Sequence, residues 1–172
     1  MMNRNAAIML FAGTAALAAC APKAPEELPP PPAEAAAPAP APTPTGPTGP
    51  VLGSQEHFVD AVNGQNVIYF DTDRYNIDSA DAAALQTQAQ YLGQYGQIRV
   101  TIEGHADERG TREYNLALGE RRANAAKNYL VGLGVDASRI ATVSYGKERP
   151  VALGSNEAAW AENRRAVSVV IN

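Results

Sequence analysis

Prolines separate the part of this chain that can fold from a part that cannot. Twelve of the thirteen prolines lie within residues 21–50, where they are interleaved with Ala and Thr. Proline fixes φ and has no backbone N–H, so a stretch this rich in it forms neither a helix nor a sheet ladder and is typical of an extended spacer. The alternative interpretation is that this stretch is a ligand for a domain that binds proline-rich segments. In either case residues 51–172 are expected to hold the folded domain.

A targeting segment is predicted ahead of the spacer. Residues 6–19 carry no charge, yet at about 14 residues they are shorter than the roughly 20 that span a bilayer. The only cysteine, Cys20, follows Leu17-Ala18-Ala19, which resembles the bacterial lipobox; an ordinary signal cut at Ala16-Leu17-Ala18 is the alternative. We interpret residues 1–19 as a lipoprotein signal peptide and residues 20–50 as a lipidated cysteine with its linker.

The lipobox implies a membrane anchor. In lipoproteins of this type the cysteine carries a diacylglyceryl thioether and an N-acyl chain. Each buried methylene contributes about 0.8 kcal/mol, so three chains anchor a protein firmly. Ala21 stands where Asp often signals retention in the inner membrane. We therefore expect a lipid-anchored protein on the periplasmic face of the outer membrane, without a transmembrane helix.

Hydrophobic periodicity within residues 51–172 predicts strands that alternate with helices. Apolar or alternating runs indicate strands, and spacing of three and four between cap residues and glycines indicates helices. The expected strands are 67–70, 98–103, 140–145 and 166–171, and the expected helices run from Asp78 or Ser79 to Gly93 or Gly96, from Thr111 to Gly132 or Gly134, and from Asn156 to Asn163. This order predicts an α/β (α+β) two-layer sandwich.

The helix after Thr111 carries small residues along its expected buried face. That face consists of residues spaced by three and four, namely Leu116, Gly119, Ala123, Ala126, Leu130 and Leu133. Small residues in its middle indicate close packing on the sheet.

Asp107 and Arg122 are the candidate site charges. Asp107 lies in the loop before this helix, and Asn115 and Arg122, seven residues apart, share nearly one azimuth of it. Two interpretations stay open from the residues alone: a structural ion pair between Asp107 and Arg122, or an acid and a base that face one charged ligand. The nearby bases are expected to be solvated charges, namely Arg109, Arg112 and Arg121.

Composition and motifs disfavour several function classes. A net charge of −4 gives no electrostatic reason to expect nucleic acid. We find no Ser or Cys nucleophile motif, no phosphate-binding Gly-Lys-Thr loop and no convincing carboxylate pair, since Asp71 and Asp73 suit a turn. His57 is far from His105, which is interpreted as a structural or hydrogen-bonding residue. We therefore expect a binding protein, not an enzyme, with no metal or other cofactor.

A longer run carries a family resemblance. From Ile102 to Asn124 the chain reads Ile-Glu-Gly-His-Ala-Asp-Glu-Arg-Gly-Thr-Arg-Glu-Tyr-Asn-Leu-Ala-Leu-Gly-Glu-Arg-Arg-Ala-Asn, which is similar to the signature of OmpA-like peptidoglycan-binding domains. The resemblance covers nearly all of residues 66–172 and implies a mixed four-stranded sheet packed against helices. One departure is Arg112, where relatives often carry Pro. Supporting matches are Tyr69-Phe70-Asp71-Thr72-Asp73, Ser144-Tyr145-Gly146 with Glu148-Arg149-Pro150, and Trp160 followed by Asn163-Arg164-Arg165-Ala166.

The resemblance implies a non-covalent site for the peptidoglycan stem peptide. Its centre would be meso-diaminopimelate, whose free end carries an ammonium and a carboxylate. By position in the motif, Asp107 is implied to receive the ammonium and Arg122 to pair with the carboxylate. Asn115 would add a hydrogen bond, Leu118 would pack on the aliphatic stem, and the loop at Asp73 would offer backbone groups.

The resemblance also implies partners. Lipid-anchored members of this family tether the outer membrane to the cell wall within the Tol system, which serves envelope integrity and cell division. They are expected to contact its periplasmic β-propeller protein and possible further OmpA-like or Tol-system proteins. One alternative is that the chain is mainly an interaction module for the propeller protein. Another is a wall hydrolase, which the missing nucleophile and metal ligands disfavour. Arg164 and Arg165 match positions that are implied to be structural.

Overall fold

The computed structural model describes residues 49–171. The predicted signal peptide, Cys20 and almost all of the linker lie outside the described residues. None of the helices in the described range is long and apolar enough to cross a membrane. The elements in chain order are α1 (Gln55–Ala61), β1 (Val67–Tyr69), α2 (Ser79–Gln94), β2 (Arg99–His105), α3 (Arg112–Gly132), the 3-10 helix η1 (Ala137–Arg139), β3 (Ile140–Gly146), α4 (Glu157–Asn163) and β4 (Arg165–Ile171).

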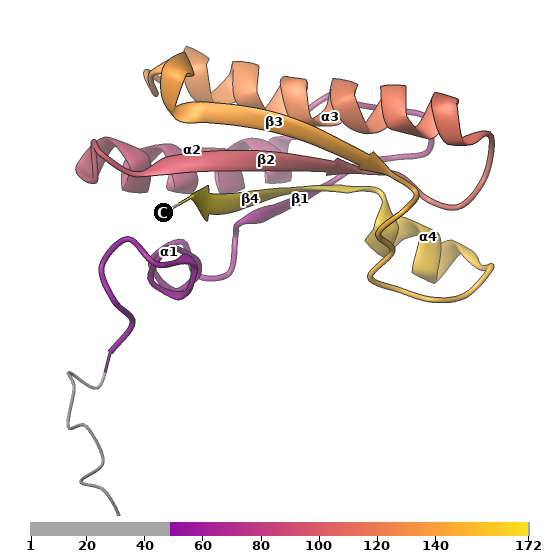
Figure 1. The fold of residues 1–172 in the computed structure, drawn as a ribbon, viewed down its shortest axis with the longest axis horizontal. Coiled ribbons are helices and arrows are strands. Elements are labelled where there is room, and N and C mark those ends of the chain that lie inside the picture. The colour runs from indigo at the N-terminus through magenta and orange to yellow at the C-terminus, as the bar shows by residue number, and fades with distance from the viewer. Residues whose placement is uncertain (1–48, 172) are drawn as a thin grey trace, which may run out of the picture. The chain divides into compact units, whose positions relative to one another are not determined.

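The strands form one mixed four-stranded sheet in the order β1-β4-β2-β3. β2 and β3 are parallel, with Val100 opposite Ile140, whereas β4 runs antiparallel to both β1 and β2. The α2 and α3 helices lie along the sheet, and α1 and α4 lie toward opposite ends of it (Figure 1). The two-layer α/β sandwich expected from the sequence is therefore confirmed.

Side-chain caps start the helices where the sequence predicts. In α2 the Asp78 carboxylate accepts a hydrogen bond from the Asp81 N–H at 2.8 Å. In α3 the Thr111 hydroxyl accepts one from the Tyr114 N–H at 3.2 Å. In α4 the Asn156 amide oxygen accepts one from the Ala159 N–H at 3.0 Å. Each bond satisfies an N–H that the helix itself leaves free. The start of α3 matters most, because the loop before it carries Asp107.

The small residues of α3 allow it to approach β2 closely. A Cβ atom added at Gly104 would lie 1.8 Å from the Gly119 carbonyl oxygen, and one added at Gly119 would lie 2.4 Å from the Ser144 hydroxyl oxygen. The predicted close packing is confirmed, but the predicted face is partly wrong. Leu133 is 42% exposed and Leu116 is only half-buried, because the buried face is rotated toward polar residues. Its members are Asn115, Leu118, Gly119, Arg122, Ala123, Ala126 and Leu130.

The α1 helix was not predicted from the sequence. Ser54 caps it by accepting a hydrogen bond from the His57 N–H at 3.1 Å, and Phe58 and Val62 enter the core. Gln55 lies against the part of β4 that extends beyond the short β1 strand. Its side-chain oxygen accepts a hydrogen bond from the Val170 N–H at 2.7 Å, and its side-chain nitrogen donates to the Ser168 carbonyl at 3.4 Å. One side chain thus occupies backbone groups that a longer β1 would have paired.

Candidate ligand-binding site

All five residues predicted to bind the ligand line one cavity. The cavity has a volume of about 260 Å³. It lies where three segments meet: the loop after β1, the loop between β2 and α3, and the first three turns of α3. The wall is formed by Thr72, Asp73, Asp107, Arg109, Gly110, Tyr114, Asn115, Leu118 and Arg122. Its charged residues are two acids and two bases, so the cavity is electrically balanced.

The fold brings these segments together through its closest backbone contact. Gly104, near the end of β2, touches Gly119 on α3, so the chain that leaves β2 passes directly beside the helix that carries Asn115, Leu118 and Arg122. Asp107 follows β2 by only two residues and is therefore held near the start of α3. The structure thus explains how an acid and a base 15 positions apart in sequence come to face one space.

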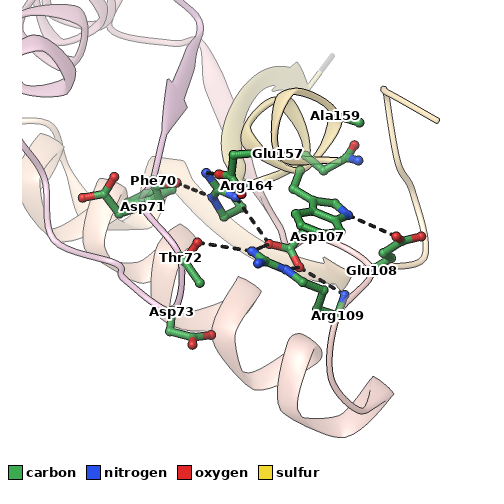
Figure 2. A network of polar contacts seen from close by, with 12 residues as sticks. Phe70, Asp71, Thr72, Asp73, Asp107, Glu108, Arg109, Glu157, Ala159 and Arg164 are labelled. Carbon is green, nitrogen blue, oxygen red and sulfur yellow. Dashed lines mark hydrogen bonds and ion pairs between the residues drawn. The ribbon is translucent and has the colours of Figure 1, made fainter. Parts of the chain in front are cut away.

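The Asp107 carboxylate is held by two arginines (Figure 2). Arg109 binds it in a fork, with Nε 3.0 Å from Oδ1 and Nη2 2.7 Å from Oδ2, and its backbone N–H donates to Oδ1 at 3.1 Å. Nη1 of Arg164 lies 3.6 Å from Oδ2. Burial favours a higher pKa of Asp107, but these hydrogen bonds and charges outweigh it and hold the pKa below its usual range. Asp107 is therefore a fixed carboxylate at neutral pH.

Arg122 is fully buried and connects α3 to the end of β2 and to the loop after β1. Its guanidinium donates to the carbonyl oxygens of Arg74 at 2.9 Å, His105 at 2.8 Å and Asp71 at 3.0 Å. Burial lowers the pKa of Arg122 to about 10, so the side chain stays charged at neutral pH. Three of its five N–H donors are used in these bonds. Arg122 therefore both shapes the loop after β1 and places a positive charge at the inner wall of the cavity.

Asp107 and Arg122 do not form the structural ion pair that was one interpretation of the sequence. Among the described residues, the ion pairs of Asp107 are with Arg109 and Arg164, and the hydrogen bonds of Arg122 go to carbonyl oxygens. The two charges face the same cavity without neutralising each other directly. This arrangement suits a ligand that carries both signs of charge.

Sequence reasoning missed four residues of the cavity wall, Thr72, Arg109, Gly110 and Tyr114, and two of them make side-chain contacts that shape it. Arg109, expected to be a solvated charge, instead binds Asp107 and stacks on Trp160, with its guanidinium carbon 4.2 Å from the ring centroid. Tyr114 donates from its hydroxyl to the Asp73 carboxylate at 3.1 Å and so connects α3 to the loop after β1. A signal for Tyr114 exists in the sequence, because it precedes Leu118 by four positions on the helix.

Asp73 adopts a backbone conformation that shapes the loop. Its φ is 57°, in the left-handed region, and the Arg74 N–H donates to the Asp71 carbonyl at 3.1 Å. Both aspartates thus take part in a turn, as the sequence predicts. The turn directs the Asp71 and Arg74 carbonyls toward Arg122.

Arg164, Arg165 and His105, which lie near the cavity, make structural contacts. Arg164 donates to the Phe70 carbonyl at 2.9 Å and to Glu157 at 2.7 Å, which ties β4 and α4 to the strand that leads into the cavity. Arg165 donates to the carbonyls of Asn163 and Arg149. His105 is 1% exposed, and neither ring nitrogen has a hydrogen-bond partner among the described residues. Burial and the charges of Arg165 and Arg149 lower the pKa of His105 to about 4, so the ring is neutral at pH 7.

Comparisons with known proteins give three further findings. A family model described as the OmpA family matches residues 69–164. The peptidoglycan-associated lipoprotein of Rhizobium meliloti (strain 1021) is 48% identical over 167 residues, 97% of this chain and 88% of the relative. The protein of that name from Haemophilus influenzae is 52% identical over 102 residues, 59% of this chain and 67% of the relative. The crystal structure of the peptidoglycan-associated lipoprotein from Burkholderia pseudomallei superposes with a TM-score of 0.63 and 46% identity, covering 66% of this chain and 99% of the solved one.

Proposed function

The chain belongs to the OmpA family, in which the relatives reported above are peptidoglycan-associated lipoproteins, and we propose that it binds peptidoglycan non-covalently as an outer-membrane lipoprotein. The match to the Rhizobium relative extends over 97% of the chain and so includes the segment with Cys20 and the prolines. We infer that Cys20 carries the lipid and that residues 21–50 form the spacer. The family names describe association with the wall and no reaction, which favours binding over catalysis.

The balanced cavity is the observation that carries this proposal. Two acids and two bases line it, and Asp107 and Arg122 face it without pairing with each other. A ligand with one free ammonium and one free carboxylate, such as the end of diaminopimelate, matches that charge pattern. A ligand that carried charge of only one sign would face a like charge, on Asp107 or on Arg122, at one side of the cavity.

The contacts leave capacity for such a ligand on both charges. A carboxylate offers about four lone-pair sites. The Asp107 carboxylate accepts three hydrogen bonds from Arg109, two at Oδ1 and one at Oδ2. The second lone pair of Oδ2 would accept from the ammonium, because Arg164 Nη1 lies 3.6 Å from Oδ2 and makes no hydrogen bond to it. Two of the five Arg122 donors are outside the three carbonyl bonds and would pair with the carboxylate. Leu118 would contact the aliphatic stem, and Asn115 and the backbone at Asp73 would complete the site.

Cosedimentation with purified sacculi tests the wall-binding site. Asp107→Asn keeps the shape of the side chain but removes the charge for the ammonium, and we expect at least a tenfold loss of affinity, the equivalent of about 1.4 kcal/mol for a charge-assisted hydrogen bond. Arg122→Lys keeps the charge but loses the fork, and a comparable loss is expected. Asp60→Asn and Arg99→Lys make the same changes at exposed positions and should bind like the parent chain. Folding is checked by circular dichroism for each variant.

Two outcomes would contradict the proposal. If folded Asp107→Asn and Leu118→Asn variants both sediment like the parent chain, the cavity does not bind the wall. If the pure chain releases muropeptides from sacculi, the protein is a hydrolase.

We further propose that the rim of this cavity contacts the β-propeller protein of the Tol system. Tyr114 is 48% exposed at the rim, and partly exposed tyrosines are common in protein interfaces. The two ligands should then compete, so soluble muropeptides are expected to weaken binding of the propeller protein. Simultaneous binding with unchanged affinities would place the protein partner elsewhere.

A further inference from the structure

A second cavity lies beside the first and has a different character. Its volume is about 330 Å³, and it is bounded by β1, the loop after β1, the start of α2 and the end of α4. The two cavities are neighbours, because Arg164 lines the second and lies 3.6 Å from Asp107 of the first. The proposed wall ligand does not explain this second space.

The second cavity is strongly acidic. Four acids line it, Asp71, Asp78, Asp81 and Glu162, against one base, Arg164. That base is already engaged, because it donates to the Phe70 carbonyl and pairs with Glu157 and Asp107. The cavity therefore presents an uncompensated negative field, unlike the balanced cavity next to it.

Asp81 is a buried carboxylate without a counter-charge. It is 8% exposed, and its Oδ1 accepts a hydrogen bond from the Tyr69 N–H at 3.1 Å. Its Oδ2 is buried and has no hydrogen-bond partner among residues 49–171. Burial raises the pKa of Asp81, and the nearby charge of Asp78 adds to the rise. A desolvated, unpaired carboxylate destabilises a fold, so this one calls for a cation that residues 49–171 do not provide.

The remaining wall suits an organic cation. Tyr69, 52% exposed, and Phe70 contribute aromatic surface to the cavity. Aromatic rings accommodate the methylene stem of a basic side chain and attract its charged end. Across the described part of the chain, no three His, Cys, Asp or Glu residues are grouped closely enough to hold a metal ion. An ammonium or guanidinium, in contrast, needs only one or two carboxylates.

We propose that this cavity binds a single basic side chain, lysine or arginine, presented by a partner protein. A protein segment can offer an isolated cation, whereas a stem peptide brings carboxylates that four acids would repel. The inference goes beyond wall binding and does not depend on it.

Nuclear magnetic resonance with model amino acids tests the proposal. The purified, isotope-labelled chain is titrated with Nα-acetyl-lysine N-methylamide and Nα-acetyl-arginine N-methylamide, with the neutral norleucine analogue as control. One or both cations should shift the Tyr69 and Asp81 amide signals to saturation and lower the pKa of Asp81. Asp81→Asn retains the acceptor for the Tyr69 N–H and should weaken binding at least about tenfold. Asp60→Asn, at an exposed position of α1, should leave the affinity unchanged.

Measuring sacculus binding and cation binding separately distinguishes a failure of this proposal from a failure of the proposed wall site. The Asp107→Asn variant should lose binding to sacculi but still bind the lysine or arginine compound. The Asp81→Asn variant should still bind sacculi but lose binding of the lysine or arginine compound. Equal shifts with norleucine, no saturable shift with either cation, or unchanged affinity in Asp81→Asn would overturn the proposal. Muropeptide shifts at Asp81, together with sacculus binding that Asp81→Asn weakens, would assign the cavity to the wall ligand and overturn it as well.

Discussion

Arg121 and Arg122 are sequence neighbours with opposite surroundings. Arg121 is exposed, with its guanidinium carbon 5.9 Å from the Tyr75 ring centroid, whereas Arg122 is 0% exposed and donates to three carbonyls. The spacing of Arg122 to Asn115 predicts that both lie on one side of the helix, and both line the cavity. The sequence could not predict that Arg122 donates hydrogen bonds to three backbone carbonyls. Two of these acceptors, on Asp71 and Arg74, lie about 50 positions away on another segment.

The first prediction compares these two arginines. Arg122→Met leaves three buried carbonyls unpaired, and we expect it to lower the free energy of unfolding by about 3–5 kcal/mol. Arg121→Met should change it by less than about 0.5 kcal/mol. Urea denaturation of both variants measures the difference. Equal stabilities would mean that the carbonyls are satisfied without Arg122.

The second prediction concerns the charge of Asp107. Arg109 holds the pKa of Asp107 down, so Arg109→Ala should raise it, as measured by carbon-13 titration of the carboxyl. A depressed pKa stabilises the fold above the unfolded value of about 3.9, and that contribution is lost as pH falls through the folded pKa. The acid-induced loss of stability should therefore shrink in Arg109→Ala. Arg112→Ala, whose exposed partner is Glu148 at 3.5 Å, should leave the Asp107 pKa unchanged.

Among the elements, helices with both a cap and a periodic apolar face were predictable, whereas the short α1 helix was missed although Ser54 caps it. The caps Asp78, Thr111 and Asn156 each accept a hydrogen bond from the N–H three residues later, so these helix starts can be recognised from neighbouring residues alone. The α1 helix has only seven residues. Its Gln55 side chain binds the backbone of β4, which is more than 100 positions away in the sequence. The face of α3 was misplaced toward Leu116 and Leu133 because a hydrophobic pattern cannot represent a face that buries Asn115 and Arg122.

The third prediction concerns the contact between α3 and β2. Gly119→Ala places a methyl group against the Gly104 carbonyl and the Ser144 hydroxyl, so we expect a loss of about 1–3 kcal/mol in the free energy of unfolding. Gly93→Ala, in α2, meets no atom within 4 Å and should be neutral or stabilising by up to about 1 kcal/mol. Thermal denaturation distinguishes the two. A neutral Gly119→Ala would show that α3 can move away from the sheet without cost.

On the scale of the whole molecule, the proposal combines an anchor, a spacer and a binding domain. The spacer of residues 21–50 would reach on the order of 90 Å if it were entirely polyproline II, at about 3.1 Å per residue. The anchor and the wall site would then act independently, because the spacer separates them in the chain.

The fourth prediction tests that independence. Cys20→Ser should move the protein from the membrane pellet to the soluble periplasmic fraction while its affinity for purified sacculi stays unchanged. Ala21→Asp should keep the protein in the membrane but shift it toward the inner one. Cellular membranes are separated after muramidase digestion, so that wall binding does not contribute. If the Cys20→Ser variant remained in the membrane pellet under these conditions, an anchor other than the Cys20 lipid would be required.

The side chain of Gln55 has a mechanical consequence. A pulling force applied at the N-terminal end of the domain reaches α1 first. The contacts that hold α1 include the core residue Phe58, the two hydrogen bonds of Gln55 to β4, and the contact of His57 Nδ1 with the Tyr91 hydroxyl at 2.8 Å. These bonds are individually weak compared with a full strand ladder, so under tension α1 would detach before the sheet separates. Detachment would expose the β4 edge while leaving the β2–α3 contact intact. The first helix would therefore lengthen the chain under load before the cavity beside α3 is disturbed.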